Sequence, residues 1–330
     1  MRSAPCVHPL RYRAYGLTLG SDVPFPELPP HAPSQDESPV DIRVTLGAAH
    51  ERHPVPIASF TSRRSASGEV WLMHARTETG YLLRFPDLAD YHVDAAGRQI
   101  AGKAVGGTAQ ETLRHLLLDQ VLPLVLTLHG RHALHATAVL TPIGVCAFTG
   151  PTGTGKSTLA ASFQLAGVPV ISDDCLLLDP SQNRIMACPA YPGVRLWDDA
   201  LQALCPAGHA TLPVAHYTSK RRPILGLSAQ GFPAGRYPLA GIYSLSRATD
   251  VHEDSAAQAR IEPINRRDAL IEVLRGTFTL DSAERAAMFD QFRWLEQVVS
   301  LIPVRKLHLP NRFAALPSVR AAILADLGAL

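Results

Sequence analysis

Short apolar runs separated by turn residues dominate the first hundred or so residues of the chain. Gly, Pro, Asp and Ser stand between these runs, as expected for strands joined by tight turns. A polar stretch at residues 24–39 contains six prolines and is typical of an extended loop. The pattern predicts a β-rich N-terminal domain over residues 1–107. The predicted strands lie at residues 12–19, 40–46, 70–74 and 81–85.

Apolar positions then change to helical spacing. Over residues 108–128 they recur every three or four positions, and Thr108 with Glu111 resembles a helix N-terminal capping box. Pro123 is expected to kink or end this helix. We interpret residues 108–131 as a connecting helix between the N-terminal domain and the next one.

The C-terminal part, residues 266–330, is predicted to be mostly helical and to act as scaffolding. An alternating run at residues 304–309 predicts one strand there. The helical apolar spacing covers residues 268–274, 282–301 and 316–327.

The segment between these parts contains a glycine-rich motif. It matches G-x-x-x-x-G-K-[ST] at every fixed position. An apolar, β-prone run at residues 143–148 precedes it, a helix-compatible run at 157–165 follows, and Gly167 is suited to end that helix. The strand, loop and helix therefore come in the order that a phosphate-binding loop requires. Its residues are Gly150, Pro151, Thr152, Gly153, Thr154, Gly155, Lys156 and Ser157.

The residue types of this motif suit a triphosphate. Gly150, Gly153 and Gly155 permit backbone angles that direct amide groups inward, where the start of a helix also favours an anion. Lys156 can reach the β- and γ-phosphates, and the Ser157 hydroxyl can bind magnesium. The sequence thus predicts binding of ATP with Mg²⁺.

Two adjacent aspartates follow the next predicted strand, residues 168–171. Only one short helix separates this strand from the glycine loop, and parallel neighbours in such a unit bring their carboxyl ends together. Asp173 and Asp174 are then expected near the phosphates, where one carboxylate can hold magnesium and the other can accept a proton from an attacking hydroxyl. The alternative is a loop pair that caps the following element.

A histidine is the third candidate. Residues 133–140 and 145–149 are predicted as a hairpin with Pro142 and Ile143 at its tip. With Thr141 facing Gly144, the register places His135 opposite the first glycine of the loop. A histidine there can hydrogen-bond an aspartate or a phosphate. The alternatives are a structural histidine at a strand edge, and His132, the less favoured neighbour.

Composition and charge narrow the partners. Lys plus Arg is 31 and Asp plus Glu is 29, a net charge of 31 − 29 = +2, which gives no reason to expect nucleic acid or an anionic membrane as partner. Five scattered cysteines without a C-x-x-C pair predict neither a disulfide framework nor a zinc site and fit a reducing cytoplasm. Cys146 and Cys175 are expected to be buried. The first residues lack the apolar core of a secretory signal.

Taken together, these residues resemble the HPr kinase/phosphorylase family. The resemblance also extends to its stand-alone relatives, which include kinases that tailor lasso peptides and other ribosomally made peptides. It is carried by Leu134-His135-Ala136, the loop through Thr158, and Ile171-Ser172-Asp173-Asp174. Features like those of the stand-alone relatives occur at residues 12–17, 23–28, 191–197 and 220–222.

The resemblance implies an α/β fold, with a mixed sheet of the type shared with phosphoenolpyruvate carboxykinase, over residues 132–265. By position, His135, Lys156, Ser157, Asp173 and Asp174 take the family's roles in transferring phosphate from ATP to a serine hydroxyl. Thr158 stands where HPr kinases usually carry glutamate. The family's downstream signature for the reverse, phosphorolytic reaction is not found, so the resemblance does not extend to a phosphorylase activity.

Basic residues downstream have two interpretations each. Lys220, Arg221 and Arg222 can clamp a phosphate or an acidic substrate segment, or they form a solvated basic loop. Arg195 can reach the active site, or its stem packs on Trp197.

The leading hypothesis is a Mg²⁺- and ATP-dependent kinase in which an Asp173 or Asp174 carboxylate deprotonates the acceptor, His135 tunes that carboxylate, and Lys156 neutralises developing charge. The expected acceptor is a protein or peptide, such as a precursor peptide. A small-molecule kinase and a nucleotide-gated regulator are the alternatives. The oligomeric state stays open, a homo-oligomer included.

Overall fold

A computed structural model describes residues 10–29, 39–47, 60–64, 68–205, 209–224, 232–233, 235–247, 259–281 and 284–329. Three sequence-based expectations fall partly or wholly outside these ranges. They concern residues 30–38 of the expected proline-rich loop, the N-terminal segment with Cys6, and residues 282–283 at the start of an expected helix.

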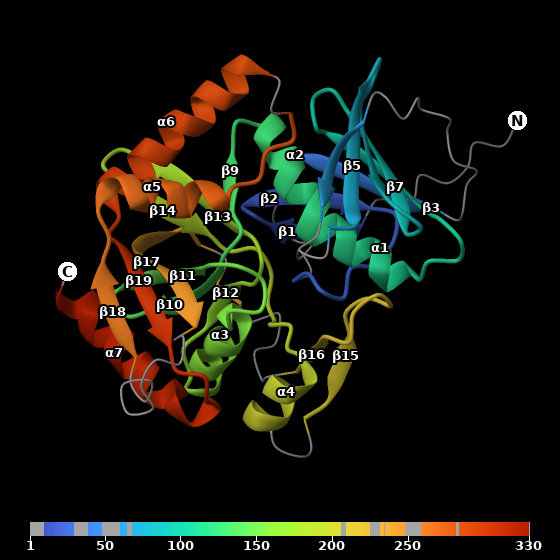
Figure 1. Ribbon diagram of the computed structural model, residues 1–330. Coiled ribbons are helices and arrows are strands. Elements are labelled where there is room, and N and C mark those ends of the chain that lie inside the picture. The colour runs from blue at the N-terminus through green and yellow to red at the C-terminus, as the bar shows by residue number, and fades with distance from the viewer. Residues whose placement is uncertain are drawn as a thin grey trace, which may run out of the picture.

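The N-terminal part of the described chain forms an eight-stranded sheet in the order β1-β2-β3-β8-β7-β6-β5-β4 (Figure 1). The four predicted runs all lie in strands, and the first of them is a hairpin turned by Tyr15 and Gly16, both with positive φ. The strands are β1 (Leu10–Ala14), β2 (Leu17–Ser21), β3 (Ile42–Gly47), β4 (Thr61–Arg64), β5 (Val70–Thr77), β6 (Gly80–Phe85), β7 (Ala89–Asp94) and β8 (Gln99–Ala104).

Three of these strands, β4, β7 and β8, were not predicted from the sequence. Strand β7 shows why, because the buried Asp90 interrupts its apolar pattern. Its carboxylate accepts hydrogen bonds from Arg84 on the neighbouring strand, at 2.9 Å from Nε and 2.7 Å from Nη2. An ion pair across the ladder therefore replaces the apolar residue that a single-sequence pattern requires.

The connecting helix is continuous but changes its winding. It consists of α1 (Gln110–Leu116), the π-helical turn η2 (Leu117–Val121) and α2 (Leu122–Leu128). The capping prediction is wrong: Ala109 is the N-cap, and the Thr108 hydroxyl donates to the Val105 carbonyl instead. Pro123 does not end the helix, since it lies in the first turn of α2 directly after the π-helical turn, where a missing N–H is tolerated.

The second sheet is mixed, as expected for an α/β fold. Among the described residues it has nine strands, seven of them in the order β12-β10-β11-β17-β14-β13-β9, while β19 pairs with both β17 and β18. A separate pair is β15 (Thr211–Pro213) with β16 (Arg221–Pro223). The nine strands are β9 (His132–Leu134), β10 (Thr137–Thr141), β11 (Gly144–Thr149), β12 (Val170–Ser172), β13 (Leu176–Ser181), β14 (Arg184–Cys188), β17 (Tyr237–Arg247), β18 (Arg260–Pro263) and β19 (Val304–Leu309).

Three parallel strands define the edge of the sheet that matters for function. Strand β11 pairs in parallel with β17, and β17 pairs in parallel with β19. Their carboxyl ends at Thr149, Arg247 and Leu309 therefore lie along one edge, the usual position for ligands in α/β sheets. Strand β12 is not the direct neighbour of β11 that the sequence suggested. Strand β10 lies between them, antiparallel to both, so β11 and β12 still end on the same side.

Helices cover both faces of this sheet. Alternation along β11 directs Phe148 toward α3 and α7, and Ala147 toward α6. The predicted C-terminal helices and the strand at residues 304–309 are confirmed. Within the described ranges, every helix falls short of the length and apolar character needed to cross a bilayer. The helices are α3 (Lys156–Leu165), α4 (Asp198–Leu204), α5 (Arg266–Arg275), α6 (Arg285–Leu301) and α7 (Leu316–Ala329), with a 3₁₀ turn, η5 (Phe313–Ala315).

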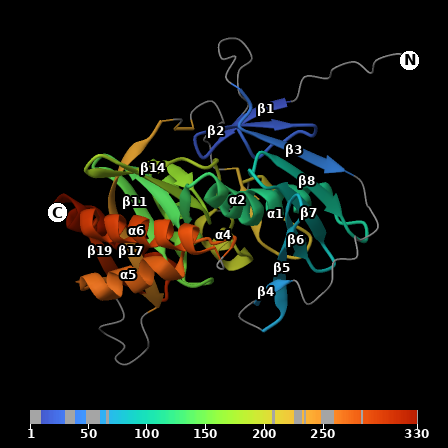
Figure 2. The same cartoon turned by 90° about the horizontal axis from the view of Figure 1, so that it is seen from above.

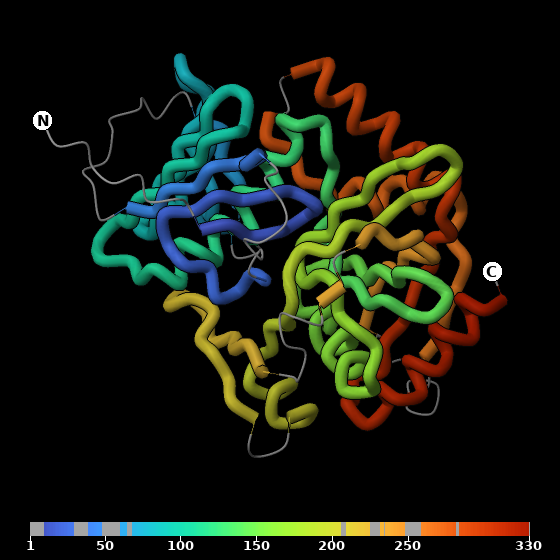
Figure 3. Tube along the Cα trace, turned by 180° about the vertical axis from the view of Figure 1, so that it is seen from behind, coloured from blue at the N-terminus to red at the C-terminus, as the bar shows by residue number. Residues whose placement is uncertain are grey.

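One apolar core joins the two sheets through the connecting helix. The helix lies between the N-terminal sheet and the second sheet when viewed from above (Figure 2). Buried side chains from the N-terminal strands, the helix and the second sheet form a single cluster, in which Tyr15, Leu117 and Leu177 are examples. From behind, the β1–β2 hairpin lies directly against the second sheet (Figure 3), where the Tyr15 N–H donates to the Pro189 carbonyl at 3.1 Å.

Candidate active site

The glycine loop leaves β11 and enters α3 as the sequence predicted. Gly150, Gly153 and Gly155 have φ angles of 134°, 83° and 101°, in the region that favours glycine. Helix α3 starts at Lys156, and Gly167 (φ 84°) follows its C-cap Ala166. The loop therefore has the backbone of a phosphate cradle at a helix N-terminus.

Gly150 offers a test of this backbone. A Cβ there would lie 2.8 Å from the Leu245 carbonyl oxygen, whereas a Cβ at Gly167 would meet nothing within 4 Å. Both positions have positive φ, which costs an L-residue about 1–2 kcal/mol. We therefore expect Gly167→Ala to lower the free energy of unfolding by this strain alone. Gly150→Ala should lower it further and should also weaken ATP binding. Urea unfolding and ATP titration measure the two effects, and equal behaviour of the variants would contradict this account.

Lys156 lies under the loop with only 5% of its surface exposed. Its ammonium group donates to the carbonyls of Gly150 and Pro151, at 2.8 and 3.2 Å. Burial lowers its pKa, and the nearby carboxylates of Asp174 and Asp173 partly oppose that shift. The ammonium group is thus placed at the loop, where a phosphate oxygen can replace a carbonyl as its partner.

Asp173 is the inner of the two aspartates. It is 1% exposed, and its Oδ1 atom accepts hydrogen bonds from the hydroxyls of Thr137 (2.8 Å) and Ser157 (2.9 Å). Burial raises the pKa of its carboxyl, and the negative charge of Asp174 raises it further. A carboxylate next to the first-turn serine of α3 is an arrangement that suits a magnesium ion.

Asp174 is the outer aspartate and lines the cavity. Its backbone is left-handed, with φ 68°, which is uncommon for a residue other than glycine. Its Oδ2 atom lies 2.9 Å from Nη1 of Arg195. Burial by itself would raise the pKa of this carboxyl. The positive charges nearby, that of Arg195 first among them, together outweigh burial and lower the pKa. Asp174 is therefore ionised at neutral pH.

His135 reaches the site, although not by the predicted geometry. The hairpin register is as expected, with Thr141 facing Gly144, but the ladder ends where Thr137 faces Phe148. The expected single strand over residues 133–140 is broken, because β9 pairs with β13 and β10 with β11. His135 lies at the break, and its Nδ1 donates to the main-chain carbonyl of Asp174 at 2.8 Å.

Arg195 connects both aspartates to a residue that the sequence did not point to. Its backbone N–H donates to Oδ2 of Asp173 at 2.9 Å, while its guanidinium pairs with Asp174 and with Asp119 of η2, each at 2.9 Å. Its guanidinium lies over the Tyr191 ring, 5.4 Å from the ring centre. Asp119 could not be recognised from the sequence, because it lies 76 positions from Arg195 and belongs to no motif.

The basic cluster separates into three environments. Lys220 lines the cavity and lies 5.5 Å from the centre of the Trp197 ring. Arg221 is exposed and bonds the Thr211 hydroxyl, as a solvated side chain would. Arg222 lies away from the cavity, 3.6 Å from Glu27 of the N-terminal part. Only Lys220 of the three is placed to meet a ligand in the cavity.

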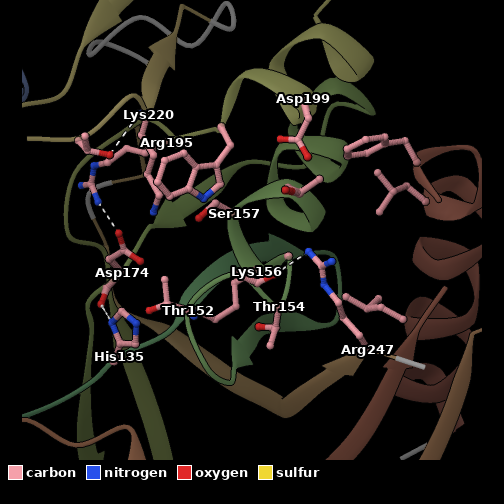
Figure 4. Close-up of a pocket in the computed structure, with 18 of the residues that line it drawn as sticks. His135, Thr152, Thr154, Lys156, Ser157, Asp174, Arg195, Asp199, Lys220 and Arg247 are labelled. Atoms are coloured by element: carbon pink, nitrogen blue, oxygen red, sulfur yellow. Dashed lines mark hydrogen bonds and ion pairs between the residues drawn. The ribbon is translucent and has the colours of Figure 1, made fainter. Parts of the chain in front are cut away.

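These groups surround one cavity of about 440 Å³ (Figure 4). The figure shows Asp174 and His135 on one side, Arg247 on the other, and Lys156 between them. The loop lines it from Thr152 to Thr158, whereas Gly150, Pro151 and Asp173 lie outside the lining. Among the described residues, no three His, Cys, Asp or Glu side chains form a metal-binding group of their own.

The far wall of the cavity comes from Arg247 and from the segment after β19, which the sequence analysis treated as scaffolding. Arg247 ends β17 and donates to the Gly153 carbonyl at 2.8 Å. The chain after β19 contributes apolar and polar side chains, because the parallel register of β17 and β19 brings both ends beside the loop. The sequence did contain one signal for this wall, the apolar run that ends in Arg247. Interpreted as another parallel strand of the sheet, that run would have placed Arg247 at the same edge as the glycine loop. The wall residues include Leu309, Asn311, Phe313, Leu316 and Val319.

Comparisons with known proteins show a likeness in structure and none in sequence. No family model matches the sequence, and no curated protein matches it. Among solved structures, the chain is similar to the HPr(Ser) kinase/phosphatase from Coxiella burnetii, with 15% identity over 59% of this chain and 97% of that chain. The TM-score is 0.31, so this likeness carries nothing about the site, whose chemistry follows from the residues themselves.

Proposed function

We propose that this chain is an ATP- and Mg²⁺-dependent kinase that transfers the γ-phosphate to a serine-type hydroxyl of a protein or peptide. One observation carries the proposal: the glycine loop, Lys156 and Asp174 line one cavity, and the buried Asp173 bonds the loop's Ser157 hydroxyl directly beside it. Such positioning, with charge stabilisation, is nearly all that phosphoryl transfer asks of a protein.

The two aspartates have separate roles in this proposal. The Ser157 hydroxyl and Asp173 would hold the magnesium ion, since both supply oxygen and already lie 2.9 Å apart. When bound, the ion supplies positive charge to the phosphate oxygens. Asp174 faces the cavity as an ionised carboxylate and would orient the acceptor hydroxyl and accept its proton.

The acceptor would enter from the side of the N-terminal part. Trp71 of β5 and Tyr217 line the cavity there, with their ring centres 5.1 Å apart. Aromatic walls of this kind are typical of sites that bind an extended segment or an apolar group. A ribosomally made precursor peptide is the specific acceptor that we propose, in line with the sequence resemblance.

Transfer of label from γ-labelled ATP tests the proposal. The protein is incubated with Mg²⁺, labelled ATP and a library of serine-containing peptides, and also with a metabolite extract. Label on a peptide supports the proposal, whereas label on a metabolite would indicate a small-molecule kinase. Tight ATP binding with no transfer to any acceptor would indicate a nucleotide-gated regulator and overturn the kinase proposal.

Lys156→Ala is expected to weaken both ATP binding and transfer. A hydrogen bond to a charged group contributes about 1.5–3 kcal/mol, which corresponds to roughly a 10- to 100-fold weaker Kd. ATP titration by calorimetry measures the first effect and the label assay the second. Lys103→Ala, on β8 of the N-terminal sheet, serves as the control. If Lys156→Ala binds ATP as tightly as the unaltered protein, Lys156 does not contact the phosphates.

A further inference from the structure

An acidic side chain from the connecting helix lines the same cavity as the glycine loop. Asp119 belongs to η2, and its side chain is 2% exposed. A buried carboxylate is costly unless charged or hydrogen-bonding groups surround it. Its partners therefore indicate what it is for.

Asp119 lines the cavity, and each of its two oxygens also has a partner. Oδ1 lies 2.9 Å from Nη2 of Arg195 and also accepts a hydrogen bond from the Tyr191 hydroxyl. Oδ2 lies 2.5 Å from Nδ1 of His115. The Tyr191 hydroxyl in turn accepts from Arg195, so Asp119, Tyr191 and Arg195 form a closed triangle.

The other half of the guanidinium points at the catalytic carboxylate. Nη1 of Arg195 pairs with Oδ2 of Asp174, and the two nitrogens belong to one rigid plane. Fixing Nη2 on Asp119 thus fixes the direction from which Nη1 meets Asp174. Without Asp119, the fork would be free to turn and engage Asp174 with both nitrogens, which would tie up the oxygen that the acceptor needs.

The backbone around Asp119 is itself held in place. Pro123 has no N–H to offer the Leu118 carbonyl, which lies five positions earlier in the π-helical turn. The Tyr15 hydroxyl, from the tip of the N-terminal hairpin, donates to that carbonyl at 3.2 Å. The N-terminal part therefore contributes to the position of Asp119.

We propose that Asp119 is a positioning residue for phosphoryl transfer, which acts by holding Arg195 in register with Asp174. This inference rests on the kinase activity proposed above. It assigns a catalytic contribution to the connecting helix, outside the glycine loop and the aspartate pair.

Asp119→Asn tests the inference, because a positioning role predicts a change in kcat without a change in the KM for ATP. We expect kcat for peptide labelling to fall about 100-fold, the order of loss that a misplacement of about 1 Å can cause, while the KM for ATP stays unchanged. Asp119→Glu, which restores the charge, is expected to recover part of kcat. Asp90→Asn removes a buried carboxylate from the Arg84 pair of the N-terminal sheet and is the control. It should leave kcat per folded molecule unchanged.

A double-mutant cycle shows whether Asp119 acts through Arg195. Arg195→Lys keeps the charge and loses the fork. If the inference holds, Asp119→Asn in the Arg195→Lys background slows transfer no further. Multiplied losses would overturn the inference, as would a normal kcat in Asp119→Asn.

Two other results are separable from these. If Asp119→Asn fails to fold, Tyr191→Phe takes its place, because this change removes one hydrogen-bond donor to Asp119. An unchanged kcat in folded Tyr191→Phe would then overturn the inference. If the unaltered protein transfers no label to any acceptor, the kinase proposal fails first, and the inference fails with it.

Discussion

Replacing Asp174 with Asn is expected to slow phosphoryl transfer by about 10²–10⁴-fold, the usual contribution of a positioned base, and to leave ATP binding nearly unchanged. The carboxylate lines the cavity and is kept ionised by Arg195, so it can accept the proton of the acceptor. The amide of Asn fills the same space but cannot take up a proton at this position. Label transfer at saturating ATP measures the loss.

The matched variants separate the aspartates. Asp179→Asn, on β13, removes a surface carboxylate that pairs with Arg236 and should retain full transfer. Asp173→Asn should instead weaken Mg²⁺ binding and raise the Mg²⁺ concentration that transfer requires, because Asp173 lies against Ser157 at the proposed metal position. Retained transfer in both Asp173→Asn and Asp174→Asn would remove the aspartates from the proposed chemistry.

Arg195→Met is expected to lower the free energy of unfolding by about 3–5 kcal/mol, the cost of removing one partner from a buried ion pair. Arg195 is 5% exposed and pairs with two carboxylates, Asp119 and Asp174. Met fills much of the same volume but leaves both negative charges without their main counter-charge. Urea unfolding at neutral pH measures the difference.

An exposed ion pair provides the comparison. Arg236 lies 2.7 Å from Asp179, with 51% of its side chain exposed, and Arg236→Met should change stability by less than about 1 kcal/mol. Similar losses in the two variants would show that the Arg195 network is no stronger than a surface contact.

The parts of the site that are contiguous in the chain could be predicted from the sequence. The loop from Gly150 to Ser157 defines its own backbone, because the glycines, the preceding strand and the following helix are all local. The N-terminal strands with clear alternation and the C-terminal helices were predicted for the same reason. Strand β7 escaped because its buried Asp90 is stabilised by Arg84, a partner that only the folded sheet reveals.

The parts that depend on tertiary pairing could not be derived. His135 was expected to extend a hairpin, yet its main-chain N–H bonds to Gly276, and the preceding Leu134 bridges to Thr277 beyond α5. For Arg195 the sequence left two interpretations open, reaching the active site or packing on Trp197, and main-chain hydrogen bonds between Leu196 and Arg221 help to decide its direction. Such contacts join segments that are far apart in the chain, where spacing carries no information.

The apolar cluster that runs from Tyr15 through the connecting helix to Leu177 has a consequence for the folding thermodynamics of the chain. Melting either sheet would hydrate apolar side chains that belong to the other, so neither half has an independent melting temperature. Heat should therefore abolish both halves in a single cooperative transition. A mutation in the N-terminal strands would then lower the population of folded protein as readily as one beside the glycine loop.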